Sequence, residues 1–275
     1  MSLVFAERER QELRVLGAIE FVDATTGARI DAPLLLTSTG AAGAPPKLTR
    51  NHAGLYVVQQ WSGLAAHAEA FLAPPALPPV GSLRLDFTLF DPAGDYLPRA
   101  FGLPLPRDPD PAHRGNADSL FTPQRVELMR AARAPLGANW SRLDVQVAEQ
   151  VSGDALGGAL VEVRDTHGAL LARSVTDWRG EAVLPVAGVP ITTWSDDAAA
   201  VVVTEIDVRV QAFFVPASGL RTTQAAANAG RPPAVLPSPD PDRLATDPAV
   251  RAGVPADLAI AARRARAVRL VVALP

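Results

Sequence analysis

The sequence contains no cysteine among its 275 residues. That absence excludes disulfides, thiolate metal ligands and cysteine nucleophiles together. Aromatic residues make up only 5% of the chain, so hydrophobic cores must be built from aliphatic side chains, chiefly Val, Leu and Ile. Such side chains favour β-strands when they alternate with polar ones.

The chain also lacks a long apolar run and a strong excess of charge of one sign. Nowhere does it reach the roughly 18 consecutive apolar residues that a membrane-spanning helix needs. The charged run Glu7–Arg10 makes the beginning of the sequence unlike a secretory signal peptide. The net charge is −3 with both signs interspersed, which gives no electrostatic footprint for nucleic acid or an acidic membrane surface. We therefore expect a cytoplasmic protein, or one incorporated into a released particle, that binds neither nucleic acid nor membrane.

Proline and glycine are abundant, with 26 Pro and 20 Gly. Both residues disfavour helix interiors, so a helical bundle is not expected. Short apolar runs separated by Asp, Gly, Asn and Pro predict strands joined by turns. The strands are expected near residues 15–22, 33–37, 55–60, 83–90, 99–105, 141–149, 158–164, 169–175, 181–187, 201–214 and 268–274. Residues 124–130 fit a strand, which we favour, or one helical turn together with Ala131 and Ala132.

A chain of this length favours two domains of moderate size. We predict a mainly β protein of two tandem Greek-key sandwich domains, at 15–133 and 134–275, preceded by an arm or short helix at 1–14. Residues 216–264 are rich in proline and have little periodicity, so we predict a long extended insertion before the last strand. A brief helical pattern covers residues 256–266 at its end.

Three reversals share one turn chemistry, in which an Asp is followed closely by a Gly. They are Asp23–Gly27, Asp91–Gly94 and Asp165–Gly168. An Asp side chain can accept a hydrogen bond from backbone two residues on, and Gly accepts a positive φ, so each pair predicts a hairpin. A Thr-containing polar turn that ends in Gly occurs once in each half, at 49–54 and 176–180.

The segments Gly158–Gly168 and Val175–Gly180 together resemble carboxypeptidase regulatory-like and transthyretin-like domains. In that family a strand, a short Asp/Gly hairpin and a Thr-Asp-x-x-Gly turn build a small Greek-key sandwich. The resemblance covers about residues 140–215 and the terminal strand, and only loosely residues 15–108. It implies an accessory or binding module. The hydrolases of this family end in Tyr-Arg-Gly-Ser, whereas this chain ends in Val271–Pro275, so their activity is not expected.

The sequence offers no recognised catalytic constellation. None of the histidines has a partner at metal-ligand spacing, so we expect all of them to be exposed in turns or loops; they are His52, His67, His113 and His167. The nucleophile-elbow pattern Gly-x-Ser-x-Gly is absent. We predict no catalytic residue and no cofactor. An unrecognised enzyme would place its chemistry on the Asp and His residues of the loop at 106–118.

Two acidic pairs have oxygen atoms of the kind that calcium binds. They are Asp196–Asp197 and the pair of Asp240 with Asp242. Neither pair has the alternating ligand spacing of a calcium loop, so we predict no metal site.

The aromatic residues expected in loops or turns are Trp61, Trp178, Trp194 and Tyr96. Exposed aromatic side chains in loops often contact carbohydrate or protein, which makes these the candidate ligand- or partner-binding residues. The alternative is that each caps the open end of a sandwich core. Trp178 lies between two charged residues at a hairpin tip and is the one expected to be exposed.

The leading functional hypothesis is a non-catalytic structural or assembly protein of a larger bacterial complex. It would dock to other protein subunits through its β domains and the proline-rich segment. The arrangement resembles accessory proteins of phage-tail-like contractile injection particles. The alternative is a carbohydrate- or protein-ligand-binding module that uses the loop aromatics.

Overall fold

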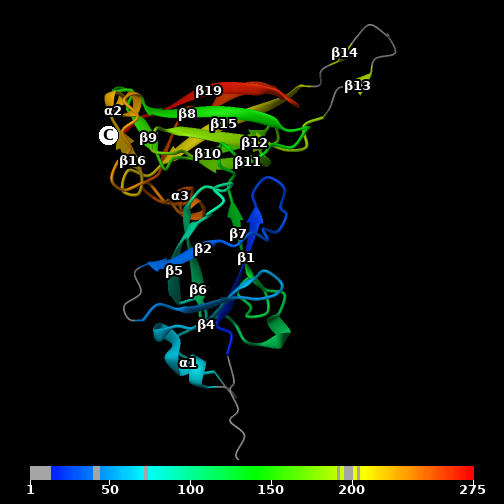
Figure 1. The fold of residues 1–275 in the computed structure, drawn as a ribbon, viewed down its shortest axis with the longest axis vertical. Coiled ribbons are helices and arrows are strands. Elements are labelled where there is room, and N and C mark those ends of the chain that lie inside the picture. The colour runs from blue at the N-terminus through cyan, green and yellow to red at the C-terminus, as the bar shows by residue number, and fades with distance from the viewer. Residues whose placement is uncertain (1–13, 40–43, 71–73, 191–192, 195–200, 203–204) are drawn as a thin grey trace, which may run out of the picture. The chain divides into compact units, whose positions relative to one another are not determined.

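The computed structural model describes residues 14–39, 44–70, 74–190, 193–194, 201–202 and 205–275. The protein is mainly β with only short helices, as the sequence predicts (Figure 1). The chain forms two compact units, each assembled from three separate segments. Unit 1 contains the described residues of Met1–Glu20, Ser38–Asp86 and Gly102–Val126, and unit 2 contains those of Phe21–Thr37, Phe87–Phe101 and Glu127–Pro275.

The strands of the first half form two sheets. One sheet has the order β3 (Lys47–Arg50), β4 (Tyr56–Gln60), β1 (Gly17–Asp23) and β7 (Gln124–Leu128). The other has the order β2 (Leu35–Thr39), β5 (Leu83–Phe90) and β6 (Arg99–Leu105). Strands β1, β2, β5, β6 and β7 each contribute residues to both units.

Three of the few phenylalanines form one aromatic cluster in unit 2. The rings of Phe87 and Phe101 stack with centroids 5.3 Å apart, and Phe21 meets Phe101 edge-on at 5.6 Å. All three side chains are at most 2% exposed. Aromatic pairs at such distances stabilise a core beyond the area they bury.

Short helices connect some of these strands. Residues Ser62–Leu64 (η1) and Ala65–Glu69 (α1) follow β4, and Pro111–His113 (η2) lies in the loop after β6. Within the described part of the chain, no helix has the length and apolar character needed to cross a membrane.

The second half of the chain also forms two main sheets. One has the order β11 (Leu170–Val175), β10 (Leu160–Asp165), β15 (Glu205–Phe214) and β17 (Arg251–Ala252), with β18 (Ala256–Ala261) also paired to β15. The other has the order β12 (Glu181–Val186), β8 (Ser141–Glu149), β9 (Ala155–Gly157) and β16 (Leu220–Thr222). The last strand, β19 (Ala265–Val272), runs parallel beside β8 (Figure 1). A separate two-stranded ribbon joins β13 (Thr193–Trp194) and β14 (Val201–Val202).

Alternation along these strands builds one aliphatic core. Leu143, Val145 and Val147 of β8 point inward, while the residues between them are more exposed. Val161 and Val163 of β10 join the same cluster from the other sheet. This pattern is the one expected when two sheets cover a shared Val/Leu interior.

The proline-rich segment at 216–264 belongs to this sandwich. It contributes β16 to one sheet and both β17 and β18 to the other, and it also holds α2 (Gln224–Asn228) and α3 (Pro241–Leu244). The helical pattern predicted at 256–266 is wrong. Residues 256–261 pair with β15 over their whole length, because long-range pairing and burial of Ile260 override local helix propensity.

The Asp/Gly reversals have the geometry that their chemistry predicts. In the turn at Asp165, the side-chain Oδ1 accepts hydrogen bonds from the backbone N–H groups of His167 at 2.9 Å and Ala169 at 2.8 Å. Gly168 closes the turn with φ +84°. The same carboxylate-to-backbone bonds occur after Asp23, Asp91 and Asp177.

Candidate binding surfaces

The loop after β6 is held together from inside by Arg107. Its side chain is buried, and Nη2 donates to the backbone carbonyls of Ala117 at 2.5 Å, Ser119 at 3.2 Å and Thr122 at 3.0 Å. Burial lowers the pKa of Arg107, and Asp118 acts in the opposite direction. The Arg107 side chain therefore holds the backbone of this polar loop in place from inside.

The structure brings Asp108 and His113 of this loop together. His113 Nδ1 lies 2.7 Å from Asp108 Oδ2, and this hydrogen bond raises the pKa of His113. The pKa of Asp108 is lowered, first by the backbone N–H of Asp110 and then by His113. Asp110 in turn caps η2 through the N–H of Ala112 at 2.8 Å. These contacts secure the loop's own turns.

The described residues contain no candidate metal site. No group of three or more His, Asp or Glu side chains among residues placed by the structure is arranged to hold a metal ion. Asp196 and Asp197 lie outside the described residues.

Asp240 and Asp242 face an arginine. Arg99 of β6 is 1% exposed, and its Nη2 lies 2.6 Å from Asp242 Oδ2 and 3.4 Å from Asp240 Oδ1. Its Nη1 donates to the backbone carbonyl of Glu127 at 2.6 Å. The same Asp240 caps α3 by accepting from the N–H of Asp242 at 3.2 Å. A buried cation thus holds the proline-rich segment in unit 2.

A second arginine completes this cluster. Arg173 of β11 donates to Asp242 Oδ1 at 2.8 Å and to Glu127 Oε2 at 3.0 Å. Burial by itself would raise the pKa of Asp242, but the guanidinium groups of Arg99 and Arg173 outweigh it and hold that pKa below its usual value. Asp242 therefore stays ionised between two cations.

A few residues before Asp240 and Asp242, the proline-rich segment exposes two adjacent apolar side chains, Val235 at 79% and Leu236 at 55%. The segment is fixed just beyond them. The backbone carbonyl of Pro239 accepts from Ala100 N–H at 2.9 Å. A Cβ built on Gly158 would lie 3.1 Å from Pro237, so glycine at this position lets the segment approach the sandwich closely.

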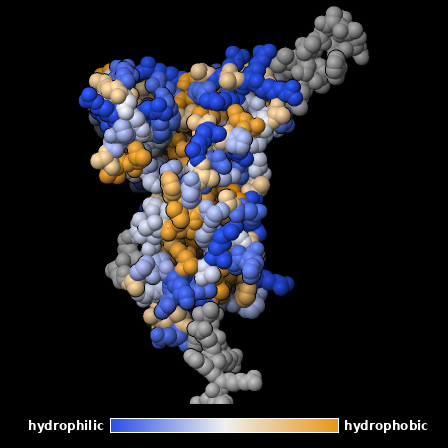
Figure 2. Space-filling model, viewed as in Figure 1, coloured by the Kyte–Doolittle hydropathy of each residue, from blue (hydrophilic) through white to orange (hydrophobic). Residues whose placement is uncertain are grey.

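Hydrophobic side chains are exposed at a second place in unit 2. Leu35 on β2 is 58% exposed, and Phe90 at the end of the neighbouring strand β5 is 55% exposed. Figure 2 shows that hydrophobic side chains reach the surface among hydrophilic ones. Exposed apolar residues that gather on one face are typical of contact surfaces.

A groove of about 670 Å³ lies in unit 2, in the size range of ligand sites. Its apolar lining includes Val183 and Val268, and its charged lining includes Arg142 and Arg179. These two guanidinium groups pair with carboxylates within the groove, at 2.7 Å for Arg142 and 2.9–3.0 Å for Arg179. Arg269 is exposed, and the described residues provide no ion-pair partner for it.

None of the four aromatic candidates is among the described residues that line this groove. Trp61 is buried against Gly63. Trp178 is half-buried rather than fully exposed, with the Arg179 guanidinium 5.9 Å from its ring centroid. Trp194 lies in β13, and its side chain falls outside the described part of the structure.

Tyr96 is half-buried and tied to the first Asp/Gly turn. Its hydroxyl donates to Asp23 Oδ2 at 3.0 Å, and Arg130 Nη2 lies 2.7 Å from the same oxygen. Burial and then the Asp23 carboxylate raise the pKa of Tyr96. The phenol therefore belongs to a fixed hydrogen-bond network.

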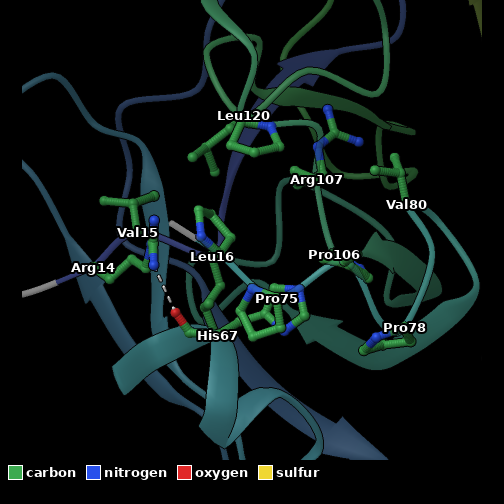
Figure 3. A pocket seen from close by; sticks show the side chains of 13 residues that line it. Arg14, Val15, Leu16, His67, Pro75, Pro78, Val80, Pro106, Arg107 and Leu120 are labelled. Atoms are coloured by element: carbon green, nitrogen blue, oxygen red, sulfur yellow. Dashed lines mark hydrogen bonds between the residues drawn. The ribbon is translucent and has the colours of Figure 1, made fainter. Parts of the chain in front are cut away.

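A smaller pocket of about 210 Å³ lies in unit 1 (Figure 3). Its lining comes from residues 14–16, from His67, from residues between 74 and 80, and from residues between 106 and 120. His67 is only 6% exposed, so the expectation that all four histidines are exposed is wrong for this one. It lies in α1, whose buried side carries this imidazole.

Sequence reasoning missed two buried polar side chains, Arg99 and His67. A signal for Arg99 exists: a lone cation opens the apolar strand β6, and such a charge needs a partner if it is buried. Nothing local identifies Asp242 as that partner, because 143 residues separate them. His67 sits in an alanine-rich stretch that gives no signal of burial.

Comparison with known proteins adds no relative to this description. No protein-family model matches the sequence, and no curated protein matches it significantly.

Proposed function

We propose that this protein is a non-catalytic component of a larger bacterial assembly and that it binds another protein through its proline-rich segment. Its resemblance to carboxypeptidase regulatory-like domains supports an accessory role. The likeness to accessory proteins of phage-tail-like contractile injection particles suggests the kind of assembly. The β2–β5 surface around Leu35 and Phe90 provides a second contact.

The observation that carries the proposal is the exposed Val235–Leu236 pair on a fixed segment. Prolines precede and follow the pair, and the Arg99–Asp242 contact anchors the chain a few residues later. An extended, proline-flanked segment loses little conformational entropy on binding, because it is already ordered. We expect a partner with an apolar, aromatic-lined groove of the kind that receives such segments.

The first test is purification of the complex from the native source. The double variant Val235→Asp/Leu236→Asp places two charges where the proposed contact is apolar, so a protein that co-purifies stoichiometrically with wild type is expected to be lost. Val254→Asp is the matched control, because Val254 is also apolar and 65% exposed in the same long segment. That variant is expected to retain the partner.

A complex that survives in the double variant would contradict docking through this segment. The variant Leu35→Asp/Phe90→Asp then separates the two surfaces: loss of the partner there alone would assign binding to the β2–β5 face. Circular dichroism and a thermal melt of each variant verify that the fold is intact.

The carbohydrate-binding alternative depends on Trp178, the candidate whose ring is half-buried at a turn and adjoins a cation. Sugar rings pack on such indole faces. Glycan binding by the wild type that disappears in Trp178→Ala would favour this alternative. Glycan binding that is unchanged in that variant would count against it.

A further inference from the structure

The small pocket of unit 1 has walls of an unusual kind. Besides Val15, Leu16, Ala76, Val80 and Leu120, its lining contains five prolines: Pro74, Pro75, Pro78, Pro106 and Pro109. Three charged or polar residues complete it, and Figure 3 shows two of them, His67 and Arg107, on different sides of the pocket. The pocket is therefore a mostly apolar space lined by pyrrolidine rings.

Two buried polar atoms of the residues that line this pocket have no hydrogen-bond partner: His67 Nδ1 and Arg107 Nε. His67 is 94% buried, judged from its 6% exposure, and its Nδ1 makes no hydrogen bond. Buried polar atoms are nearly always satisfied, and leaving one unsatisfied costs about 1–3 kcal/mol. The unpaired imidazole nitrogen beside a mostly apolar cavity therefore points to a ligand that brings a hydrogen-bonding group to His67.

We propose that this pocket binds a phenolic ring, with the ring between the prolines and its hydroxyl on His67 Nδ1. The volume of about 210 Å³ suits a substituted single ring, because a cavity of about 150 Å³ accepts benzene. A hydroxyl both donates and accepts, so it satisfies Nδ1 in either neutral tautomer of the imidazole. A hydrocarbon ring would leave that nitrogen unpaired.

The arginines at the pocket are engaged in part. Arg14 Nη1 donates to the carbonyl oxygen of His67 at 3.0 Å, as Figure 3 shows. Arg107 Nη2 donates to three loop carbonyls, although its Nε lacks a partner. A phenol matches the unpaired His67 Nδ1, whereas the unpaired Arg107 Nε makes an anionic ring the rival to be tested directly.

Three probes of matched shape distinguish these cases: p-cresol, toluene and 4-methylbenzoate. Binding is followed by the imidazole ¹⁵N–¹H spectrum of the full chain, in which the exposed His52, His113 and His167 are internal controls. The proposal predicts that p-cresol shifts the His67 signals alone. It also predicts that p-cresol binds about 3- to 10-fold more tightly than toluene, as one neutral hydrogen bond implies.

The variant His67→Leu removes the hydrogen bond and keeps an apolar wall. This variant is expected to bind toluene and p-cresol equally. If it does not fold, the comparison of p-cresol with toluene in the wild type still tests the proposal. N-acetyl-tyrosine amide identifies the source of the ring. Its binding indicates a tyrosine side chain of another molecule, and binding of p-cresol alone indicates a free phenol.

Three results would overturn the proposal. They are the absence of any shift at His67 with p-cresol, equal affinity of the wild type for p-cresol and toluene, and tighter binding of 4-methylbenzoate than of p-cresol. The last result would assign the pocket to an anion.

Discussion

The Arg99 guanidinium lies 2.6 Å from the Asp242 carboxylate, although 143 residues separate the two in sequence. Arg99 opens β6, and Asp242 lies in α3 of the proline-rich segment. This contact joins the proline-rich segment to β6 within unit 2, six residues after the exposed Leu236.

The first prediction concerns this pair, in which the Arg99 side chain is buried and the Asp242 side chain is half-exposed. Asp242→Asn removes one carboxylate from a nearly inaccessible guanidinium, and Asp240 at 3.4 Å compensates only in part. We expect the free energy of unfolding to fall by about 2–3 kcal/mol, below the roughly 3–5 kcal/mol of a fully broken buried pair. Chemical denaturation measures the change.

The control for that variant is Asp257→Asn. Asp257 pairs with Arg209 at 2.8 Å, but both side chains are more than half exposed. Exposed pairs contribute about 0–1 kcal/mol, so this variant should change stability little. Equal losses in the two variants would show that the Arg99 cluster has no special role.

The second prediction concerns pH. Glu149 accepts hydrogen bonds from the backbone N–H groups of Ser152 at 2.5 Å and Val151 at 2.9 Å, and these lower its pKa to about 2. A lowered folded-state pKa favours the folded state when the carboxylate is charged. This stabilisation is therefore complete above the ordinary pKa of 4.5 and is lost as the pH falls towards 2.

Glu149→Gln tests this directly. The stability difference between wild type and variant is expected to be constant near neutral pH and to shrink between pH 4.5 and pH 2. The exposed Glu69→Gln controls for the loss of one negative charge. A difference that stays the same down to pH 2 would rule out the backbone hydrogen bonds as its cause.

The third prediction compares two glycines with positive φ. A Cβ on Gly180 (φ +71°) would lie 2.3 Å from the Val147 carbonyl oxygen, whereas a Cβ on Gly168 (φ +84°) meets nothing within 4 Å. Gly168→Ala should cost about 1–2 kcal/mol from backbone strain alone. Gly180→Ala should cost distinctly more, because backbone must also move, and thermal denaturation of the two variants gives the comparison. Similar losses would mean that β8 yields easily.

The turns and most strands could be predicted because their signals are local. The turn at Asp165 needs only two local features. The Asp165 carboxylate accepts hydrogen bonds from the backbone of His167 and Ala169, and Gly168 adopts a positive φ. Alternation likewise identified β5 and β8, each of which buries every second residue.

The remaining structure depends on contacts distant in sequence. Residues 256–261 have a locally helical composition, and only β15 makes them a strand. The burial of His67 and Arg99 likewise depends on packing against other segments. The sequence identified the region around Val235 only as a proline-rich stretch. The exposure of the Val235 side chain depends on how the segment packs against the rest of unit 2, and no local pattern indicates that packing.

The fourth prediction tests whether the long segment is structural. Ile260 of β18 is 0% exposed in the core of the second sandwich. Ile260→Ala should lower the free energy of unfolding by about 2–5 kcal/mol through lost burial and a cavity. Val254→Ala, at a site 65% exposed, should have little effect. A tolerated Ile260→Ala would mean that β18 is dispensable for the fold.

The most direct measurement of the central claim is the affinity of the co-purified partner for purified wild type and variants, by isothermal titration calorimetry. If Val235 and Leu236 form the contact, Val235→Asp/Leu236→Asp should weaken binding by about 100-fold, the scale of a binding hot spot. Val254→Asp should stay within about twofold of wild type, because surface substitutions outside a hot spot are nearly neutral. An unchanged affinity in the double variant would contradict the account.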